Sequence, residues 1–473
     1  MSARMIMICL DGADGRMLDH YSTDGSLPNL SALRRRGSGK SLSASPGSTD
    51  DALWASFQYA RDVGEHGRYA YRVPQKNNRM APAHEMEQAP TFWDRLSDQG
   101  LRVAILDVPK CRAPRPLNGI QIVDWLTHGE YFQSPRSYPS SAIDGILRRF
   151  GARASHHCDY VELAIDRQQP EKVISTLLAE ISMKRDAGLH FLHSGAWDLL
   201  CIGFSQLHCV NHKYWDFERI PAIDQLQITH RPIFTMLQAM DAAIGALISD
   251  AGPAAECIVL APTDFQPNGS LEHLMPEVIA RINSNLCRKL KGQKSPKWPF
   301  NLKLAQAMTG NHPESWPCTI VPFSDDFLAL RISAAGEHKL FRDASSPRPD
   351  TWLLDAVEKE LRDLRGDGGA PLPDFLITRP ASAHTGRCAA NLPDLLMHYP
   401  SGYFSDVLLS ASIGRVERKS PTWRKGNHRD GGFVLACGQA ASTVIADVER
   451  ISDIGKLAHR VVAGRNPRPL AVG

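Results

Sequence analysis

Apolar runs of five or six residues alternate along the chain with segments whose apolar residues recur at helical spacing. The runs predict buried strands, and the periodic segments predict amphipathic helices. We expect strands at residues 5–10, 103–108, 199–204, 256–261 and 433–437. We expect helices at residues 27–36, 50–59, 92–100, 143–150, 170–187, 232–248 and 274–286. Because strand follows helix repeatedly, the pattern predicts an α/β fold with a mostly parallel central sheet covered on both faces.

The composition and periodicity of the chain change between residues 287 and 391, where it is basic, rich in Pro and Gly, and only intermittently periodic. We expect one strand and one helix there, at 327–332 and 352–364. The prediction is an α/β core whose first part is 1–286, an inserted cap at 287–391, and the last part of the core at 392–473, with the main sheet resuming at 394–397. The cap contains aromatic residues that either line a pocket or, as we favour, form the cap's own core. These are Trp298, Phe300, Trp316 and Phe323.

Composition narrows the classes of protein. A hydrophobic content of 43% and a charged content of 22% are ordinary for a soluble globular protein, and a net charge of +3 gives no reason to expect a nucleic-acid partner. We recognise no apolar run long enough to cross a bilayer, and the N-terminus is interpreted as a first strand rather than a signal peptide. The ten cysteines are scattered without a CxxC motif, which favours reduced thiols and a cytoplasmic location. The tail after Gly464 is expected to be disordered.

Residues 197–215, WDLLCIGFSQLHCVNHKYW, contain the clearest candidate chemistry. An expected strand ends at Phe204, and His208 and His212 follow at a spacing that places both imidazoles on one helical face. The carboxyl edge of a doubly wound sheet is where ligands bind. A third candidate, His428, precedes the last expected strand. The alternative is that the pair are two solvated helix histidines.

Two further groups are expected near the same edge. Asp11 follows the first strand directly and is either a site residue or a turn-capping aspartate. Ser48 and Thr49 precede the expected helix 50–59, where a hydroxyl either caps the helix or acts as a nucleophile at a helix N-terminus that favours anions. His66, in the sequence GEHG, is either a site residue or a turn histidine.

The order of these motifs resembles the alkaline phosphatase superfamily, specifically its type I phosphodiesterase and nucleotide pyrophosphatase branch. The resemblance extends from the N-terminus to about Gly438 and implies the alkaline phosphatase-like three-layer sandwich. The matching pieces are LDGADGRMLDHYSTDGSLPNLSALRRRGS, PGSTDDALWASF followed by GEHG, FSQLHCVNHKYW, APTDFQPN, and PDLLM followed later by GNHRDGGFVLACG.

The resemblance implies two divalent metals, usually zinc, around a Thr or Ser nucleophile. One metal would bind His208, His212 and His428, with His208 where many members have Asp. Three imidazoles and an open position suit a catalytic zinc and favour it over magnesium or calcium. We therefore expect Zn²⁺ at this site.

The second metal site is incomplete. Asp11 is present, but the Asp-His pair of the family falls on Pro262 and Thr263. Asp264, shortly after them, would serve as a ligand only if the turn were rebuilt. Lys213, Arg424 and Arg429 are candidates to replace the missing positive charge, although each is also typical of a surface position.

The position of the nucleophile stays open between neighbours. Counting back from Trp54 by the commonest family spacing reaches Asp50, whose carboxylate is an alternative metal ligand. Because a metal-activated nucleophile requires an alcohol, we predict Thr49 as the catalytic residue, with Ser48 next.

The expected function is that of a metal-dependent hydrolase of the phosphodiesterase or phosphatase type. It would act on a small-molecule phosphate ester by in-line displacement, through a metal-activated Thr or water. One alternative is a sulfatase-like or group-transfer enzyme on the same scaffold, with a sulfate ester as a possible substrate. The other is a non-catalytic relative that retains one metal, which the residues Pro262 and Thr263 favour. We expect no nucleic-acid or membrane partner.

Overall fold

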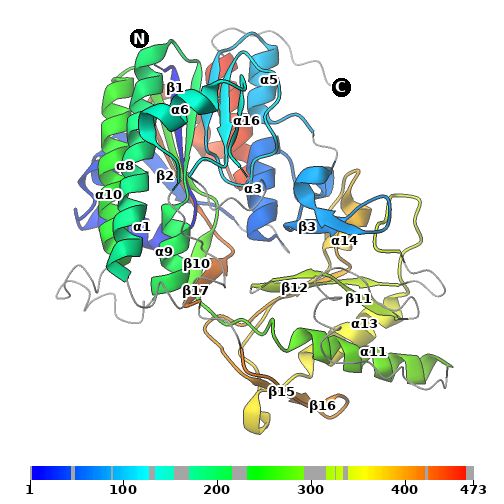
Figure 1. The fold of residues 1–473 in the computed structure, drawn as a ribbon. Helices are drawn as coiled ribbons and strands as arrows, with labels where there is room; N and C mark the ends of the chain where they lie inside the picture. The colour runs from blue at the N-terminus through cyan, green and yellow to red at the C-terminus, as the bar shows by residue number, and fades with distance from the viewer. Residues whose placement is uncertain are drawn as a thin grey trace.

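An eight-stranded sheet forms the centre of the molecule (Figure 1). The computed structural model describes residues 3–43, 48–86, 89–126, 134–153, 170–215, 232–291, 316–324, 326–333, 339–420 and 424–464. In spatial order the strands of this main sheet are β2 (Gly37–Ser41), β18 (Phe433–Cys437), β9 (Glu256–Ala261), β1 (Met5–Leu10), β8 (Leu199–Phe204), β5 (Val103–Leu106), β6 (Gly119–Val123) and β7 (Arg136–Tyr138).

The five strands from β9 to β6 are parallel, and the antiparallel strands β18 and β7 flank them. All six residues of β1, β8 and β9 are buried, as expected for strands covered on both faces. Successive residues of β1 alternate between two separate hydrophobic clusters. Because each face of the sheet has its own core, the α/β fold with a mostly parallel central sheet is confirmed.

Helices cover both faces of the main sheet and make it the middle of three layers (Figure 1). Those packed on the Ile6, Ile8 and Leu10 side are α1 (Gly15–Thr23), α2 (Pro28–Arg36), α8 (Pro170–Ser194), α9 (Gln206–Tyr214) and α10 (Pro232–Ala251). Those packed on the Met5, Met7 and Cys9 side are α3 (Asp50–Tyr59), α5 (Phe92–Asp98) and α16 (Ile451–Ala463).

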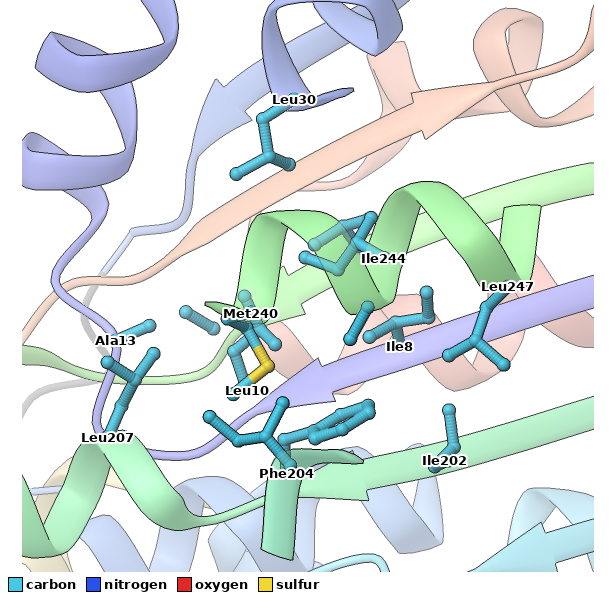
Figure 2. Packing of buried hydrophobic residues seen from close by; sticks show 14 of the residues in the cluster. Ile8, Leu10, Ala13, Leu30, Ile202, Phe204, Leu207, Met240, Ile244 and Leu247 are labelled. Atoms are coloured by element: carbon cyan, nitrogen blue, oxygen red, sulfur yellow. The ribbon is translucent and has the colours of Figure 1, made fainter. Parts of the chain in front are cut away.

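Helix α10 is a core helix with an unusually apolar sequence. Figure 2 shows its residues Met240, Ile244 and Leu247 packed over strands β1 and β8, against Ile8 and Ile202. The helix has 20 residues, and an 18-residue stretch of it has a mean hydropathy of 1.4, so by length and composition it meets the criterion for a membrane-spanning helix. This segment was not expected to contain a run of that length and apolar character. The burial of one side of α10 against the sheet accounts for its apolar character.

The thiols lie mostly inside the cores. Cys9 and Cys201 are neighbours on β1 and β8, with Sγ atoms 3.7 Å apart. The nine cysteines within the described ranges are free. The expected cytoplasmic location stays a prediction.

A second lobe extends from the carboxyl edge of the main sheet (Figure 1). The chain leaves β9 through β10 (Asp264–Pro267) and returns to β18 through β17 (Gly426–Arg429), and these two short strands pair with each other. The described part of residues 268–425 contains an antiparallel sheet of β11 (Cys318–Phe323), β12 (Phe327–Ile332), β14 (Leu395–His398) and β13 (Ile377–Thr378). Helices α11 (Met275–Lys291) and α13 (Thr351–Arg362) and the hairpin β15 (Val407–Ser410) to β16 (Gly414–Glu417) share its hydrophobic cluster.

Two predictions about this region were wrong. Strand β14, expected to resume the main sheet, pairs instead with β12 and β13. Helix α11, assigned to the first part of the core, packs in the second lobe through residues such as Val278 and Ile282. The boundaries drawn at 286/287 and 391/392 therefore move outward, because an apolar run shows that a segment is buried but not which sheet buries it. Trp298, Phe300 and the tail after Gly464 lie outside the described residues.

Replacing Ile244 with Ala should lower the free energy of unfolding by about 2–5 kcal/mol, because the side chain is completely buried between α10 and the sheet. Urea denaturation followed by tryptophan fluorescence measures this loss. Gln238→Ala, at an exposed position of the same helix, is the control and should stay within about 0.5 kcal/mol of the wild type. Equal losses in the two variants would contradict the packing of α10 described above.

Candidate metal centre

Three histidines from two distant segments converge at the carboxyl edge of the main sheet. His208 and His212 lie on α9, directly after β8, and His428 lies on β17. The ring centroids are 4.5 Å apart for His208 and His212, 4.9 Å for His208 and His428, and 5.1 Å for His212 and His428. One potential ligand atom of each ring lies within 4.8 Å of the others. The structure thus brings together the three histidines singled out from the sequence.

The geometry of these imidazoles fits a tetrahedral zinc ion. The Nε2 atoms of His208 and His212 are 3.3 Å apart. Two nitrogen ligands of a tetrahedral zinc, each bound at about 2.0–2.1 Å, lie about 3.3–3.4 Å from each other. His212 Nδ1 is 2.8 Å from the carbonyl oxygen of Gly426, so it donates its proton there and leaves the Nε2 lone pair available.

Thr263 supports the third imidazole. Its Oγ1 lies 3.3 Å from His428 Nδ1. When Nδ1–H donates to Thr263, the Nε2 lone pair of His428 is available for a metal, in the same way as that of His212. Thr263 is therefore in contact with one of the three clustered histidines.

Close backbone packing fixes the position of α9. Gly12, in the turn after β1, has a φ of +75°, and a Cβ there would lie 2.3 Å from His208 Cα. Asn211 donates from Nδ2 to the Gly12 carbonyl, and the backbone N–H of Lys425 donates to the His212 carbonyl at 2.7 Å. The turn after β1, helix α9 and the start of β17 are thus tied directly to one another.

Phe265 provides an apolar wall for the histidines. Its ring centroid is 5.0 Å from that of His212 and 4.6 Å from that of His428, and its backbone pairs with His428 in the β10–β17 ribbon. Trp215 packs on the same ring. Sequence reasoning missed Phe265, although its place in APTDF at the end of β9 was a usable signal.

A second group of potential ligands shares His208. It contains Asp11 and Asp50, with ligand atoms within 4.8 Å of one another. Asp11 is fully buried and accepts a hydrogen bond of 3.1 Å from Trp54 Nε1. At an effective dielectric constant of about 20, two carboxylates at this separation repel each other by roughly 3 to 4 kcal/mol. A cation close to both is needed to offset that repulsion.

Lys110 supplies a cation beside Asp50, and the sequence pattern had not singled it out. It forms an ion pair with Asp50, and its Nζ lies 3.6 Å from Asp51 Oδ1. It follows the end of β5 in the sequence LDVPK, so it occupies the same sheet edge as Asp11 and His208. That position after a parallel strand was the signal available in the sequence. Arg429, one of the cations suggested from the sequence as a replacement for the missing charge, lies 3.9 Å from Asp264.

Thr49 has the geometry of a helix cap. Its hydroxyl accepts a hydrogen bond of 3.2 Å from Ala52 N and donates to the carbonyl oxygen of Tyr69. Asp50, the next residue, lies with Asp11 and His208 and has Oδ2 3.6 Å from His428 Nε2. Ser48 is buried near the start of the same helix. The structure therefore brings Asp50, rather than the hydroxyl of Thr49, into contact with the histidines.

Asp264 lies outside both groups of potential ligands formed by the described residues. Its Oδ1 accepts a hydrogen bond of 2.8 Å from Gly15 N, which holds the carboxylate over the start of α1. Burial and the neighbouring Asp14 carboxylate raise the pKa of Asp264. The turn at Pro262 and Thr263 is not rebuilt in the way that a ligand role would require.

His66 is a structural turn histidine at the end of α4 (Val63–His66). Its Nε2 is 3.0 Å from Ser56 Oγ, and its Nδ1 accepts from Arg68 N at 3.1 Å. Burial and the nearby Arg68 lower the pKa of His66 to about 3, so it is neutral at physiological pH.

Comparison with known proteins identifies the class of protein that this fold and site define. The model of the type I phosphodiesterase / nucleotide pyrophosphatase family matches residues 5–261. The match covers more than half of the chain, and the chain belongs to that family. The protein is therefore a member of a family of phosphoric ester hydrolases, as the motifs had implied. A search of curated proteins found no match.

Solved structures share the fold at low sequence identity. Phosphonoacetate hydrolase from Sinorhizobium meliloti 1021, in complex with phosphonoacetate, is 12% identical with a TM-score of 0.56, and the alignment covers 98% of this chain and 96% of that one. Murine ectonucleotide pyrophosphatase/phosphodiesterase 5 is 10% identical with a TM-score of 0.51, covering 97% and 95%. At these identities the similarity establishes the alkaline phosphatase-like fold.

Replacing Gly12 with Ala should weaken zinc binding by about tenfold or more, because the new Cβ would displace His208 from its partner ring. Gly25→Ala is a matched control: Gly25 has a φ of +87° but no neighbouring heavy atom within 4 Å, so it has the backbone strain alone. Competition with a chromophoric zinc chelator measures both affinities. Equal affinities in the two variants would contradict the role assigned to the close Gly12–His208 contact.

Proposed function

We propose that this protein is a zinc-dependent phosphoric ester hydrolase of the phosphodiesterase type that acts on a small phosphate ester. The observation behind the proposal is the 3.3 Å separation of the His208 and His212 Nε2 atoms, with the His428 ring beside both. Membership in the type I phosphodiesterase family supports the reaction class. Zn²⁺ held by the three imidazoles would polarise a phosphoryl oxygen and favour deprotonation of the attacking group.

The attacking group in this proposal is water. The Thr49 hydroxyl donates its proton to the Tyr69 carbonyl and accepts from Ala52 N, so attack by Thr49 would require both hydrogen bonds to break. Asp50 Oδ2, 3.6 Å from His428 Nε2, faces the edge of the histidine group. Asp50 accepts a proton from a water molecule while the oxygen of that water attacks phosphorus. The ester P–O bond breaks on the opposite side, and the departing alkoxide takes a proton from solvent.

The buried surroundings support this chemistry. His208 and His212 are 4% and 0% exposed, Phe265 packs against His212, and Trp215 packs on Phe265. Exclusion of water by this packing strengthens the interactions of a charged phosphoryl group with nearby cations.

A non-catalytic relative that keeps one metal is the second candidate. It is favoured by Pro262 and Thr263, which interrupt the second metal site, and by the capping geometry of Thr49. The two candidates agree on zinc binding and differ in turnover. Metal content and hydrolysis therefore have to be measured on the same preparation.

We expect the purified wild-type protein to contain about one zinc per chain. His212→Ala should lose that zinc and lower the rate of bis(p-nitrophenyl) phosphate hydrolysis at least about 100-fold. His193→Ala is the control, because His193 is an exposed histidine paired with Asp250. Elemental analysis and a continuous assay provide the two readouts. Wild-type protein without transition metal would refute the proposal, and zinc without turnover would favour the non-catalytic relative.

Hydrolysis of an aryl phosphodiester should exceed that of the corresponding phosphate monoester and sulfate ester by about tenfold or more in kcat/KM. The preference over the sulfate ester follows from the family. The preference over the monoester follows from a centre with only one complete set of metal ligands, which suits a singly charged phosphoryl group better than a dianion. Side-by-side assays of the three p-nitrophenyl esters test it. A preference for the sulfate ester would instead assign a sulfatase-like activity.

A further inference from the structure

We propose that the Lys110 ammonium replaces the second divalent cation of this active site. The centre would then combine one metal with one fixed organic cation, and Lys110 would interact with the phosphoryl group of the substrate. This inference rests on the proposed function. It adds a substrate-contacting residue and a metal stoichiometry that the family relationship does not supply.

The second site keeps two carboxylates, those of Asp11 and Asp50. Asp11 and Asp50 remain close to each other and to His208, with ligand atoms within 4.8 Å. Pro262 has no metal-binding side chain, and Thr263 lies against His428. Two clustered carboxylates are thus retained without the Asp-His pair that would complete a metal site. They still require a positive charge beside them.

Lys110 lies beside two carboxylates at the start of α3. It pairs with Asp50, lies 3.6 Å from Asp51, and is only 8% exposed. Asp50 is 6% exposed. Buried ammonium groups are rare unless they are paired, and this one is paired with the carboxylate nearest to the histidines. Its charge therefore lies beside Asp50, one of the carboxylates that would hold the second cation.

The backbone around Lys110 is held in a strained conformation. Lys110 has a φ of +54°, and Asp107 in the same loop has a φ of +52°. Residues other than glycine seldom adopt this region, and strained positions of this kind cluster at functional sites. A surface lysine would not need such a conformation.

Two buried side chains hold the loop in that shape. Arg68 Nη2 donates to the Lys110 carbonyl at 2.6 Å, and Gln58 Nε2 donates to the Pro109 carbonyl at 2.9 Å. Gly203 of β8 packs so closely that a Cβ would lie 2.4 Å from the Asp107 carbonyl oxygen. The loop is fixed from α3, from residue 68 and from the main sheet, and this fixes the direction of the Lys110 side chain.

An ammonium differs from a metal ion in ways that bear on the reaction. It donates hydrogen bonds to phosphoryl oxygens but does not exchange ligands, and it supplies one unit of charge less than Zn²⁺. A phosphodiester carries one negative charge and a monoester up to two. The combination of one zinc and Lys110 therefore matches a diester, and the orientation of Lys110 by Asp50 and Asp51 positions it before the substrate binds.

Lys110→Met tests the inference, because Met keeps the length of the side chain and removes its charge. The variant should retain one zinc per chain, since the three histidines are untouched, and lose about 100-fold or more in kcat/KM for bis(p-nitrophenyl) phosphate. Lys110→Arg should recover part of that loss. Lys456→Met, which removes an exposed ion-paired lysine, is the control and should match the wild type.

A second test restores the missing ligands of the second site and measures zinc content, so it does not depend on activity. Pro262→Asp with Thr263→His restores the family's ligand types at the second site. In the Lys110→Met background these changes should raise zinc content from one to two per chain, whereas with Lys110 present the content should stay at one. Circular dichroism and retention of the first zinc verify folding of each variant.

The outcomes separate this inference from the proposed function. Absence of zinc in the wild-type protein would overturn both the proposed function and the role of Lys110. One zinc with wild-type turnover in Lys110→Met would overturn the role of Lys110 and leave the proposed function standing. Two zinc ions per wild-type chain would also overturn it, and this measurement does not depend on the folding of any variant.

Discussion

The contact between the turn after β1 and the first turn of α9 is the constraint on which the rest of the metal centre depends. Gly12 lies so close to His208 that no side chain fits between them, and Asn211 binds the Gly12 carbonyl. This contact joins the end of the central strand to the helix that holds two histidines. The β10–β17 ribbon then brings His428 to the same point, and Phe265 packs against the rings. A metal site from distant segments needs this rigidity, because small displacements of a ligand weaken binding.

Charge balance is the second organising feature. The N-terminus of α3 and the end of β1 place Asp50, Asp51 and Asp11 in a largely buried region, and a cation must accompany them. Lys110 meets that need from a loop whose strained backbone is fixed by Arg68 and Gln58. The chain thus keeps the scaffold of its family, and in the proposed centre Lys110 would supply the positive charge beside these carboxylates.

Much of the fold followed from local patterns. Strands β1, β8, β9 and β18 and helix α3 have the bounds that their apolar runs and the cap at Thr49 predict, because burial and capping act over a few residues. The assignment of β14 and α11 failed, since an apolar run is equally suited to either of two sheets. The family spacing reached Asp50, and Thr49 was predicted as the nucleophile because it carries an alcohol. The hydrogen bond from Thr49 to Tyr69 and the place of Asp50 beside the histidines depend on tertiary packing, which the spacing does not show.

The sequence by itself determined the α/β class, the family and the three histidines. Strand ends and a four-residue helical spacing are local properties, and the parallel sheet necessarily gathers its carboxyl ends at one edge. Only the tertiary structure decided that Asp264 accepts a hydrogen bond from Gly15 N instead of joining the potential ligands, and that Lys110 pairs with Asp50. The physical reason is that such pairings join residues far apart in the chain. Which charge faces which carboxylate is set by packing between elements, and no local pattern records it.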